Sequence, residues 1–156
     1  MQRFVPDLVY DASGAIEGRL ASITAKALMQ GKKVAVVNVE KAVISKPLDA
    51  VVKWLQPWYG IHSWINPRRY SPRKYMTPEG YFRTSVRNML PVDKPKGREA
   101  YARLRVYSGV PPDLSGFPVQ RPEEVMWKGR EGTATTLLEV GLYYGRVKRK
   151  EVKDQI

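Results

Sequence analysis

The chain contains no cysteine and only one histidine, His62. The first absence excludes disulfides, thiolate metal ligands and cysteine nucleophiles, and it agrees with an intracellular protein. The second excludes a metal site built from several histidines, and no dense cluster of carboxylates replaces it. A Ser-His-Asp arrangement that uses His62 stays open, but Ser13, Ser22 and Ser85 have no evident base beside them. We therefore expect no catalytic residues, no cofactor and no metal.

Long apolar runs are also missing. No stretch approaches the roughly 20 residues that a membrane-spanning helix needs, and the start, MQRFVPDLVYDAS, has no apolar signal-peptide region. We expect a soluble, cytoplasmic protein. The phosphate-binding patterns G-x-G-x-x-G and G-x-x-x-x-G-K-[ST] do not occur. The turn DASGAIEG at 11–18 lies at a predicted helix start, where a phosphate could bind; we interpret Gly14 as a turn residue and Gly18 as a point of close approach by backbone or RNA.

Acidic residues are few for the number of basic ones. There are 15 Asp and Glu against 27 Lys and Arg, which gives a formal net charge of +12 and an isoelectric point near 10.0. A folded chain with this excess repels itself, and a polyanion is the usual partner that relieves the repulsion. RNA, DNA and acidic membranes all qualify, and a basic surface that is merely solvated is the competing explanation.

The first sixty residues have the pattern of an α/β protein. The range 8–12 reads as a short strand, and 16–30 has apolar residues at helical spacing with a glycine as its left-handed cap. The range 34–39 (VAVVNV) is nearly continuously apolar, as a strand covered on both faces requires. Strand, helix and strand in about 30 residues predict a βαβ unit with a parallel sheet. Lys46–Pro47 opens a further helix, which ends or kinks at Pro57.

The middle of the chain is rich in proline, aromatic and basic residues. The range 59–78 has no clear period, so we expect an extended, structured loop. Thr77 followed by proline predicts a helix start, and the helix should run to about residue 90. A second basic loop at 91–98 follows.

The last third is less regular. We expect a helix from about 98 to 107 and an irregular segment over 113–132. Thr136 can cap a final short helix that ends at Gly145, before a charged tail.

Most of the net positive charge lies between Asn66 and Ser108. This range holds eleven basic and three acidic residues, a net of +8, with aromatic residues threaded among them. Guanidinium groups bind phosphate oxygens in pairs, and aromatic or Arg planes stack on unpaired bases. The loops at 66–78 and 91–98 favour RNA contact most, because cations without nearby acids lack partners within the chain and prolines limit the entropy lost on ordering. Basic residues on the helices can equally form solvated faces, and helical aromatic residues are more often core.

Three segments together resemble the ribosomal protein L13 family, in its archaeal branch. They are VYDASGAIEGRLASITAKALMQGKKVAVVNVEKAVIS at 9–45, FRTSVRNMLPVDKPKGREAYARLRVYSGVPP at 82–112, and TLLEVGLYYG at 136–145. The first is similar to the family's D-A-x-G-x-x-x-G-R-L-A-S opening, and the second to its R-x-x-R-G-M-L-P region with the A-x-x-R-L-x-V-Y-x-G-x-P that follows. The third is similar to a closing helix of the archaeal branch.

The resemblance implies a three-layer α/β/α fold around a mostly parallel central sheet, with extended basic loops and additional helices. It implies one domain over 1–156, with an α/β core at about 8–60, basic RNA-binding loops and helices at about 61–112, and an irregular segment, C-terminal helix and basic tail at about 113–156. It also implies a structural, assembly-supporting role on the large ribosomal subunit without catalysis. The expected partners are the large-subunit rRNA and neighbouring ribosomal proteins.

The expected RNA contacts combine the charge pattern with the family's G-R step and M-L-P region. The candidates are Arg19, Arg68, Arg69, Arg73, Lys74, Arg83, Arg87, Lys94, Lys96, Arg98, Arg105, Arg146, Lys148 and Arg149. Trp64, Tyr70 and Tyr75 are candidates for stacking on bases or packing on neighbouring proteins.

The chain departs from the family pattern at three places: Asn88 replaces a usual glycine, Ser45–Lys46 stands where glycine is common, and Val92–Asp93 replaces His-Lys. Asparagine tolerates a left-handed backbone better than most residues. Two other functions remain open. A nucleotide-dependent or RNA-modifying enzyme on a Rossmann-like core would need a pocket near residues 13–18, and a free-standing RNA-binding regulator would not sediment with large subunits.

Overall fold

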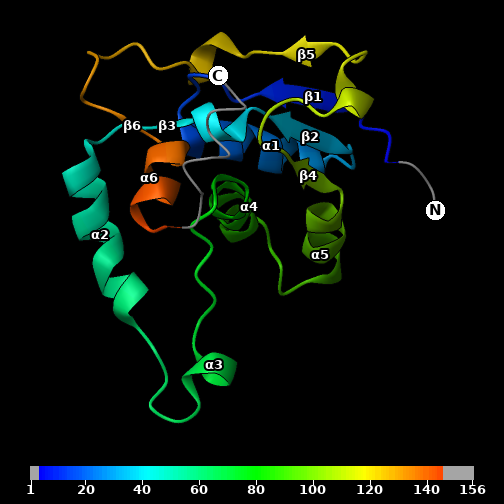
Figure 1. Cartoon of the computed structure of the whole chain (residues 1–156). Helices are drawn as coiled ribbons and strands as arrows, with labels where there is room; N and C mark the ends of the chain where they lie inside the picture. The colour runs from blue at the N-terminus through cyan, green and yellow to red at the C-terminus, as the bar shows by residue number, and fades with distance from the viewer. Residues whose placement is uncertain (1–3, 146–156) are drawn as a thin grey trace.

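A four-stranded, wholly parallel sheet is the centre of the computed structural model, which describes residues 4–145 (Figure 1). The strand order is β4-β2-β1-β5, and the strands are β1 (Leu8–Asp11), β2 (Val34–Val37), β4 (Leu104–Val106) and β5 (Val119–Gln120). Leu8 of β1 lies opposite Val34 of β2, with helix α1 (Glu17–Met29) between the two strands in the chain. The predicted βαβ unit with a parallel sheet is confirmed.

The position of the central strand β2 explains why its sequence is apolar throughout. Val34 and Val36 pack with the core on one face of the sheet, and Ala35 and Val37 pack with the core on the other. All four residues are buried. A strand covered on both faces has no position for a polar side chain, so alternation disappears. The strand is shorter than predicted because Asn38 takes a left-handed backbone and starts the 3₁₀-helix η1 (Val39–Lys41).

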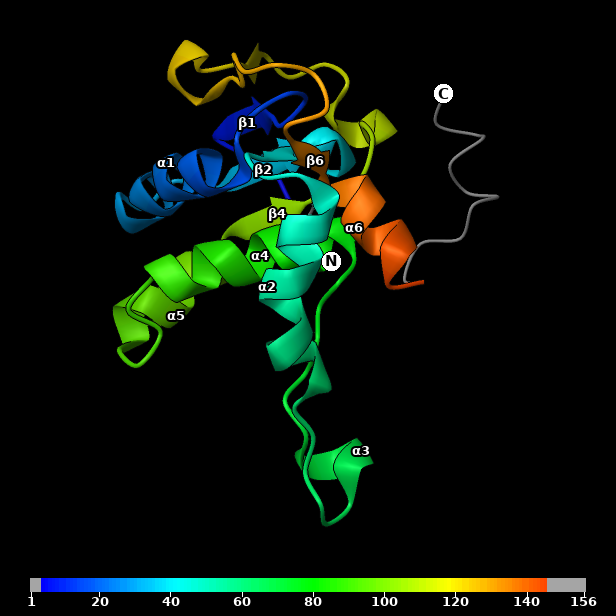
Figure 2. The ribbon, with the colours of Figure 1, turned by 90° about the vertical axis from the view of Figure 1, so that its left-hand side faces the viewer.

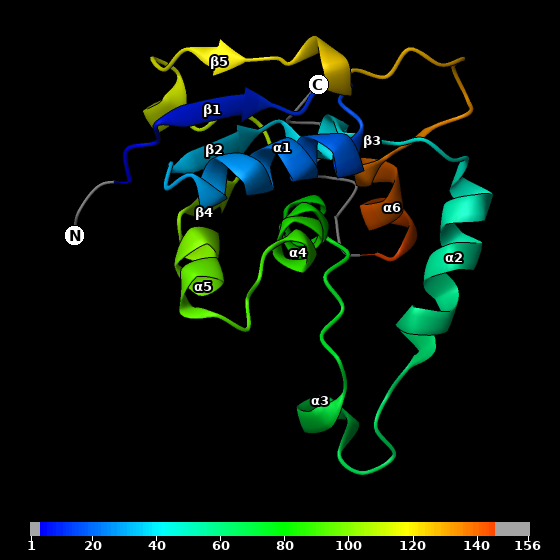
Figure 3. The same cartoon turned by 180° about the vertical axis from the view of Figure 1, so that it is seen from behind.

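Helices cover the two faces of the sheet unequally. Against one face pack α1, α4 (Pro78–Met89) and α5 (Pro95–Ala102), with Leu20, Leu28 and Phe82 in the shared core. Figure 3 shows α1 crossing this face with α4 and α5 beside it. The other face is covered by the short 3₁₀-helix η2 (Pro112–Leu114) and flanking segments. The expected α/β/α layering is confirmed, with a thin third layer.

A smaller unit extends the body at one end of the sheet. Strands β3 (Val43–Ile44) and β6 (Thr135–Thr136) pair antiparallel, and each leads towards a helix, α2 (Leu48–Gly60) and α6 (Leu137–Tyr143) respectively. Thr136 caps α6 as predicted: its hydroxyl accepts from the Glu139 N–H, and the Glu139 carboxylate accepts from the Thr136 N–H, which forms a capping box. Pro57 lies inside α2, which continues to Gly60.

The prediction of a helix over 98–107 was wrong. Helix α5 starts earlier, at Pro95, and ends at Ala102, and Leu104–Val106 form β4 beside β2. The sequence RLRVY alternates basic and apolar residues, a strand period, but it is too short to be distinguished from a helical stripe. The segment 113–132, expected to be irregular, contributes β5 and the 3₁₀-helix η3 (Glu123–Val125). These strands depend on pairing with distant segments, which local sequence does not show.

One segment projects away from the body. Residues 61–75, here called the arm, leave the end of α2, form the one-turn helix α3 (Pro67–Tyr70) and return to α4. Figures 1 and 2, turned by 90°, both show the arm extending away from the sheet. The expected loop over 59–78 is thus shorter, since α2 occupies its start. Within residues 4–145, no helix is long and apolar enough to cross a membrane.

Candidate nucleic-acid interface

The arm is fixed at its root. Met76, directly after it, is 1% exposed and packs with Val51, Leu55 and Val140. Lys74 donates from Nζ to the Tyr59 carbonyl, and the same ammonium lies 5.3 Å from the Tyr59 ring centroid. These contacts hold the returning chain against the last turn of α2. Lys74 is therefore engaged within the chain.

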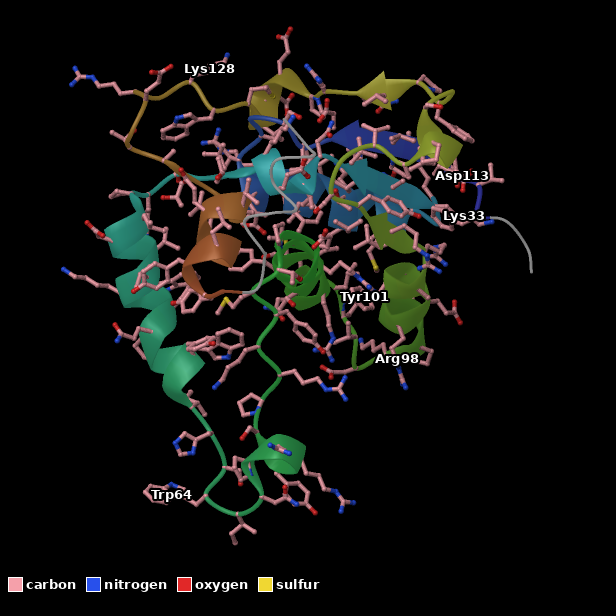
Figure 4. The ribbon with its side chains drawn as sticks, viewed as in Figure 1. Lys33, Trp64, Arg98, Tyr101, Asp113 and Lys128 are labelled. Atoms are coloured by element: carbon pink, nitrogen blue, oxygen red, sulfur yellow. The ribbon has the colours of Figure 1, made fainter. Side chains whose placement is uncertain are left out.

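The outer part of the arm is exposed and rich in cations and aromatic rings. Arg68, Arg69 and Tyr70 of α3 are all exposed, and Trp64 is 94% exposed near the tip (Figure 4). The Arg69 guanidinium lies 5.4 Å from the Tyr70 ring. Large exposed aromatic rings that lie together are typical of surfaces that a partner covers. The geometry suits an element that inserts into a larger assembly.

The arm is preorganised by local contacts. The Ser63 N–H donates to the Ser71 hydroxyl over 2.9 Å, which ties the two sides of the arm together. Asn66 has a positive φ of 50°, a conformation asparagine adopts more readily than most residues, and Pro67 then starts α3. An arm ordered before binding loses less entropy when it binds.

A groove lies where the arm meets the body. Its volume is about 940 Å³, and its walls come from α2, the returning side of the arm, α4 and α5. Among the predicted contacts it brings together Arg73, Arg83 and Arg87. The aromatic residues in its lining are Trp54, Trp58, Tyr75, Tyr81 and Tyr101. Figure 4 shows Tyr101 between α4 and α5.

The start of α5 carries a second group of cations. Lys94, Lys96 and Arg98 are all exposed, and Figure 4 shows Arg98 on the half of the molecule towards the arm. The predicted loop at 91–98 is shorter than expected, because Pro95 already opens the helix. Gly97 is buried against the preceding turn: an added Cβ would lie 2.0 Å from the Pro91 carbonyl oxygen. Contact of backbone with backbone thus fixes the direction of the two flanking cations.

Other predicted contacts lie apart from this surface. Arg19, on α1, is exposed and donates to the Glu124 carbonyl over 3.4 Å. Arg105 lies on the edge strand β4, where its guanidinium donates to the carbonyls of Ala102 and Leu104 and lies 5.1 Å from the Phe4 ring. Arg146, Lys148 and Arg149 lie outside the described residues.

The turn at 11–18 is closed to a nucleotide by the chain itself. The Ile16 N–H at the start of α1 donates to the Val125 carbonyl over 2.7 Å, and the Gly14 carbonyl accepts from the Trp127 N–H. Gly14 has a positive φ of 70° and acts as a turn residue, as predicted. The Ile16 N–H is therefore already used by the segment 125–127 and is not available to a phosphate.

Two buried acids near this turn are structural. Asp11 is 3% exposed; burial alone would raise its pKa, but hydrogen bonds from the Ser13 N–H, Asn38 and Arg121 lower the pKa overall. The Arg121 Nε–Asp11 Oδ2 distance of 2.7 Å ties the segment after β5 to the end of β1. Burial raises the pKa of Glu17, although the Ser85 hydroxyl acts in the other direction, and Glu17 Oε1 has no hydrogen-bond partner among the described residues.

Several residues of the interface were not predicted from the sequence. Trp54 and Trp58 lie one helical turn apart on α2 and both line the groove. Two large aromatic residues beside the buried stripe of a helix, just before a basic segment, were the available signal. Met76, which anchors the arm, gave no such signal in the sequence.

Asn88 has no positive φ: it lies within α4, so the substitution of the family's usual glycine imposes no left-handed backbone.

Proteins of one family are similar to this chain in sequence. The family model described as "Ribosomal protein L13" matches residues 7–113. The "Large ribosomal subunit protein uL13" of Methanocaldococcus jannaschii is 43% identical over 107 residues, which cover 69% of this chain and 78% of that protein. The protein of the same name from Archaeoglobus fulgidus is 40% identical over 88% of this chain and 86% of its own length. That of Sulfolobus acidocaldarius is 33% identical over 91% of this chain and 95% of that protein.

Among residues 4–145, no group of three or more potential metal-ligating side chains occurs.

Proposed function

The chain belongs to the ribosomal protein L13 family, and from this membership we propose that it is a structural constituent of the large ribosomal subunit that binds and stabilises the large-subunit rRNA during and after assembly. A ribosomal protein of this family is a structural component and not an enzyme. Neighbouring large-subunit proteins are the second class of partner, and the exposed tip of the arm is the surface that suits them.

The observation that carries the proposal is the arm together with the cations beside it. Arg68 and Arg69 on the arm, and Lys96 and Arg98 on α5, are exposed and have no carboxylate partner among residues 4–145. Phosphate oxygens are the natural counter-charges for such a surface. Recognition should rest on RNA shape, because the major groove of double-stranded RNA is too narrow for side-chain readout.

The test is the salt dependence of rRNA binding. We expect the variant carrying Arg68→Ala, Arg69→Ala, Lys96→Ala and Arg98→Ala to bind large-subunit rRNA more weakly and to show a flatter plot of log K against log salt. Each lost phosphate contact lowers the slope by about 0.7–0.9, so four contacts lower it by roughly three. These four residues do not line the groove, so the test is independent of it.

A matched control removes the same charge elsewhere. Lys32, Lys33, Lys128 and Arg130 are exposed, and Figure 4 shows Lys33 and Lys128 on the half of the molecule away from the arm. Their replacement by alanine should change the slope by less than the value of about 0.7–0.9 that is expected for one phosphate contact. Equal slopes for the two quadruple variants would mean that net charge, and not this surface, governs RNA binding.

A further inference from the structure

The groove between α2, the arm and α4 is lined by exposed aromatic residues that the scaffold does not require. Trp54 is 63% exposed and Tyr75 is 46% exposed, although both are large aromatic residues with a buried core beside them. Exposed apolar side chains that lie together mark sites of interaction with a partner. The volume, about 940 Å³, lies within the range of roughly 300–1,000 Å³ that is usual for pockets that bind small molecules.

The charges of the groove identify the kind of ligand. Arg73, Arg83 and Arg87 line it, and no Asp or Glu among residues 4–145 does. Arg83 and Arg87 are four residues apart on α4, so they project from one side of the helix and repel each other. Neither makes an ion pair with a carboxylate of the described residues. The Arg83 guanidinium lies 5.2 Å from the centroid of the Tyr101 ring.

We propose that this groove holds an unpaired nucleotide of RNA, with its base against the rings of Trp54 and Tyr75 and its phosphate on Arg83 and Arg87. This inference rests on the proposed function and specifies one part of it. An anion with a flat aromatic group satisfies both halves of the lining, and a nucleotide is such a ligand. A paired base cannot enter, because its faces are covered by its neighbours in the helix, so the site selects bulged or extruded nucleotides.

The test compares two short RNA duplexes that differ only by one bulged 2-aminopurine. We expect the wild-type chain to bind the bulged duplex about tenfold more tightly than the fully paired one and to quench the 2-aminopurine fluorescence, since stacking of one base on an aromatic side chain supports a preference of at least that size. The variant Trp54→Leu, Tyr75→Leu should lose both the preference and the quenching. The preference is read as the ratio of the two affinities, so a general weakening of RNA binding in the variant would leave it unchanged.

The matched control is Tyr143→Leu, which removes an exposed tyrosine of α6 that does not line the groove. It should keep the full preference for the bulge. Equal affinity of the wild type for the two duplexes, or an undiminished preference in the double variant, would overturn the nucleotide site and leave the large-subunit role intact. If the wild type bound neither duplex nor the large-subunit rRNA, the proposed function itself would be overturned.

Discussion

At the scale of single residues, the surroundings of three buried residues show where the fold is constrained. Gly97 allows α5 to start directly against the Pro91 carbonyl, and Asp11 joins β1 to the segment after β5 through Arg121. Glu17 is different, because it is buried at the start of α1 and one of its carboxylate oxygens has no hydrogen-bond partner within the described part of the chain. A negative charge at a helix N-terminus is favourable, but desolvation of the carboxylate opposes it.

We predict that Glu17→Gln stabilises the protein at pH 7. Burial raises the pKa of Glu17 in the folded state, so the folded chain binds a proton more readily than the unfolded chain, and stability falls as the pH rises from the unfolded pKa of about 4.3 through the folded one. Glutamine removes this loss. The melting temperature of the variant should exceed that of the wild type at pH 7, and the difference should shrink towards pH 4.

The exposed Glu131→Gln serves as the control for Glu17→Gln and should show no such pH-dependent difference. A Glu17→Gln variant that melts lower than the wild type at pH 7 would mean that the carboxylate is compensated by the α1 N-terminus and its neighbours.

Gly97→Ala should destabilise the fold. The added methyl group would meet backbone atoms, with the Pro91 oxygen 2.0 Å away, and backbone moves less readily than a side-chain end. We expect the free energy of unfolding, measured in urea, to fall by about 2 kcal/mol, despite the better helix propensity of alanine. Gly116→Ala meets open space and should change it by less than about 0.5 kcal/mol. Equal effects of the two changes would contradict the close packing at residue 97.

At the scale of elements, those with strong local signals were predictable and those made by distant pairing were not. Helix α1 with Gly31 at its end, the Thr77 and Thr136 caps and the buried run of β2 follow from period and capping chemistry. Strands β4 and β5 were missed because each gains its hydrogen bonds from a strand far away in sequence. The cations of the arm were predictable from composition. The grouping of Arg73, Arg83 and Arg87 with aromatic residues of α2 was not, because it depends on how α2 and α4 pack.

The arm as an element depends on one buried side chain. Met76→Ala removes most of the side chain that packs against Val51, Leu55 and Val140, and we expect the free energy of unfolding to fall by about 2–5 kcal/mol. Met89→Ala is the control: Met89 is 47% exposed on α4, so its effect should stay within about 0.5 kcal/mol. Urea denaturation checks both. Similar losses at the two positions would mean that Met76 does not anchor the arm.

At the scale of the whole molecule, the distribution of the net charge of +12 suits the binding of a polyanion. In the α/β core the buried Asp11 is held by internal hydrogen bonds, and the arm, the groove and the start of α5 present cations to the outside. Such a surface repels itself in isolation, and a polyanion removes the repulsion while releasing counterions. The same distribution accounts for exposed aromatic rings on the arm, which a packed ribonucleoprotein would cover.

The most direct test of this account is sedimentation of cell extract through a sucrose gradient, with the wild-type chain and the Arg68, Arg69, Lys96 and Arg98 alanine variant expressed in turn. The account predicts that the wild type comigrates stoichiometrically with the large subunit in moderate salt and leaves it only in stripping salt, and that the variant leaves at lower salt. A wild-type chain found only at the top of the gradient would contradict the account.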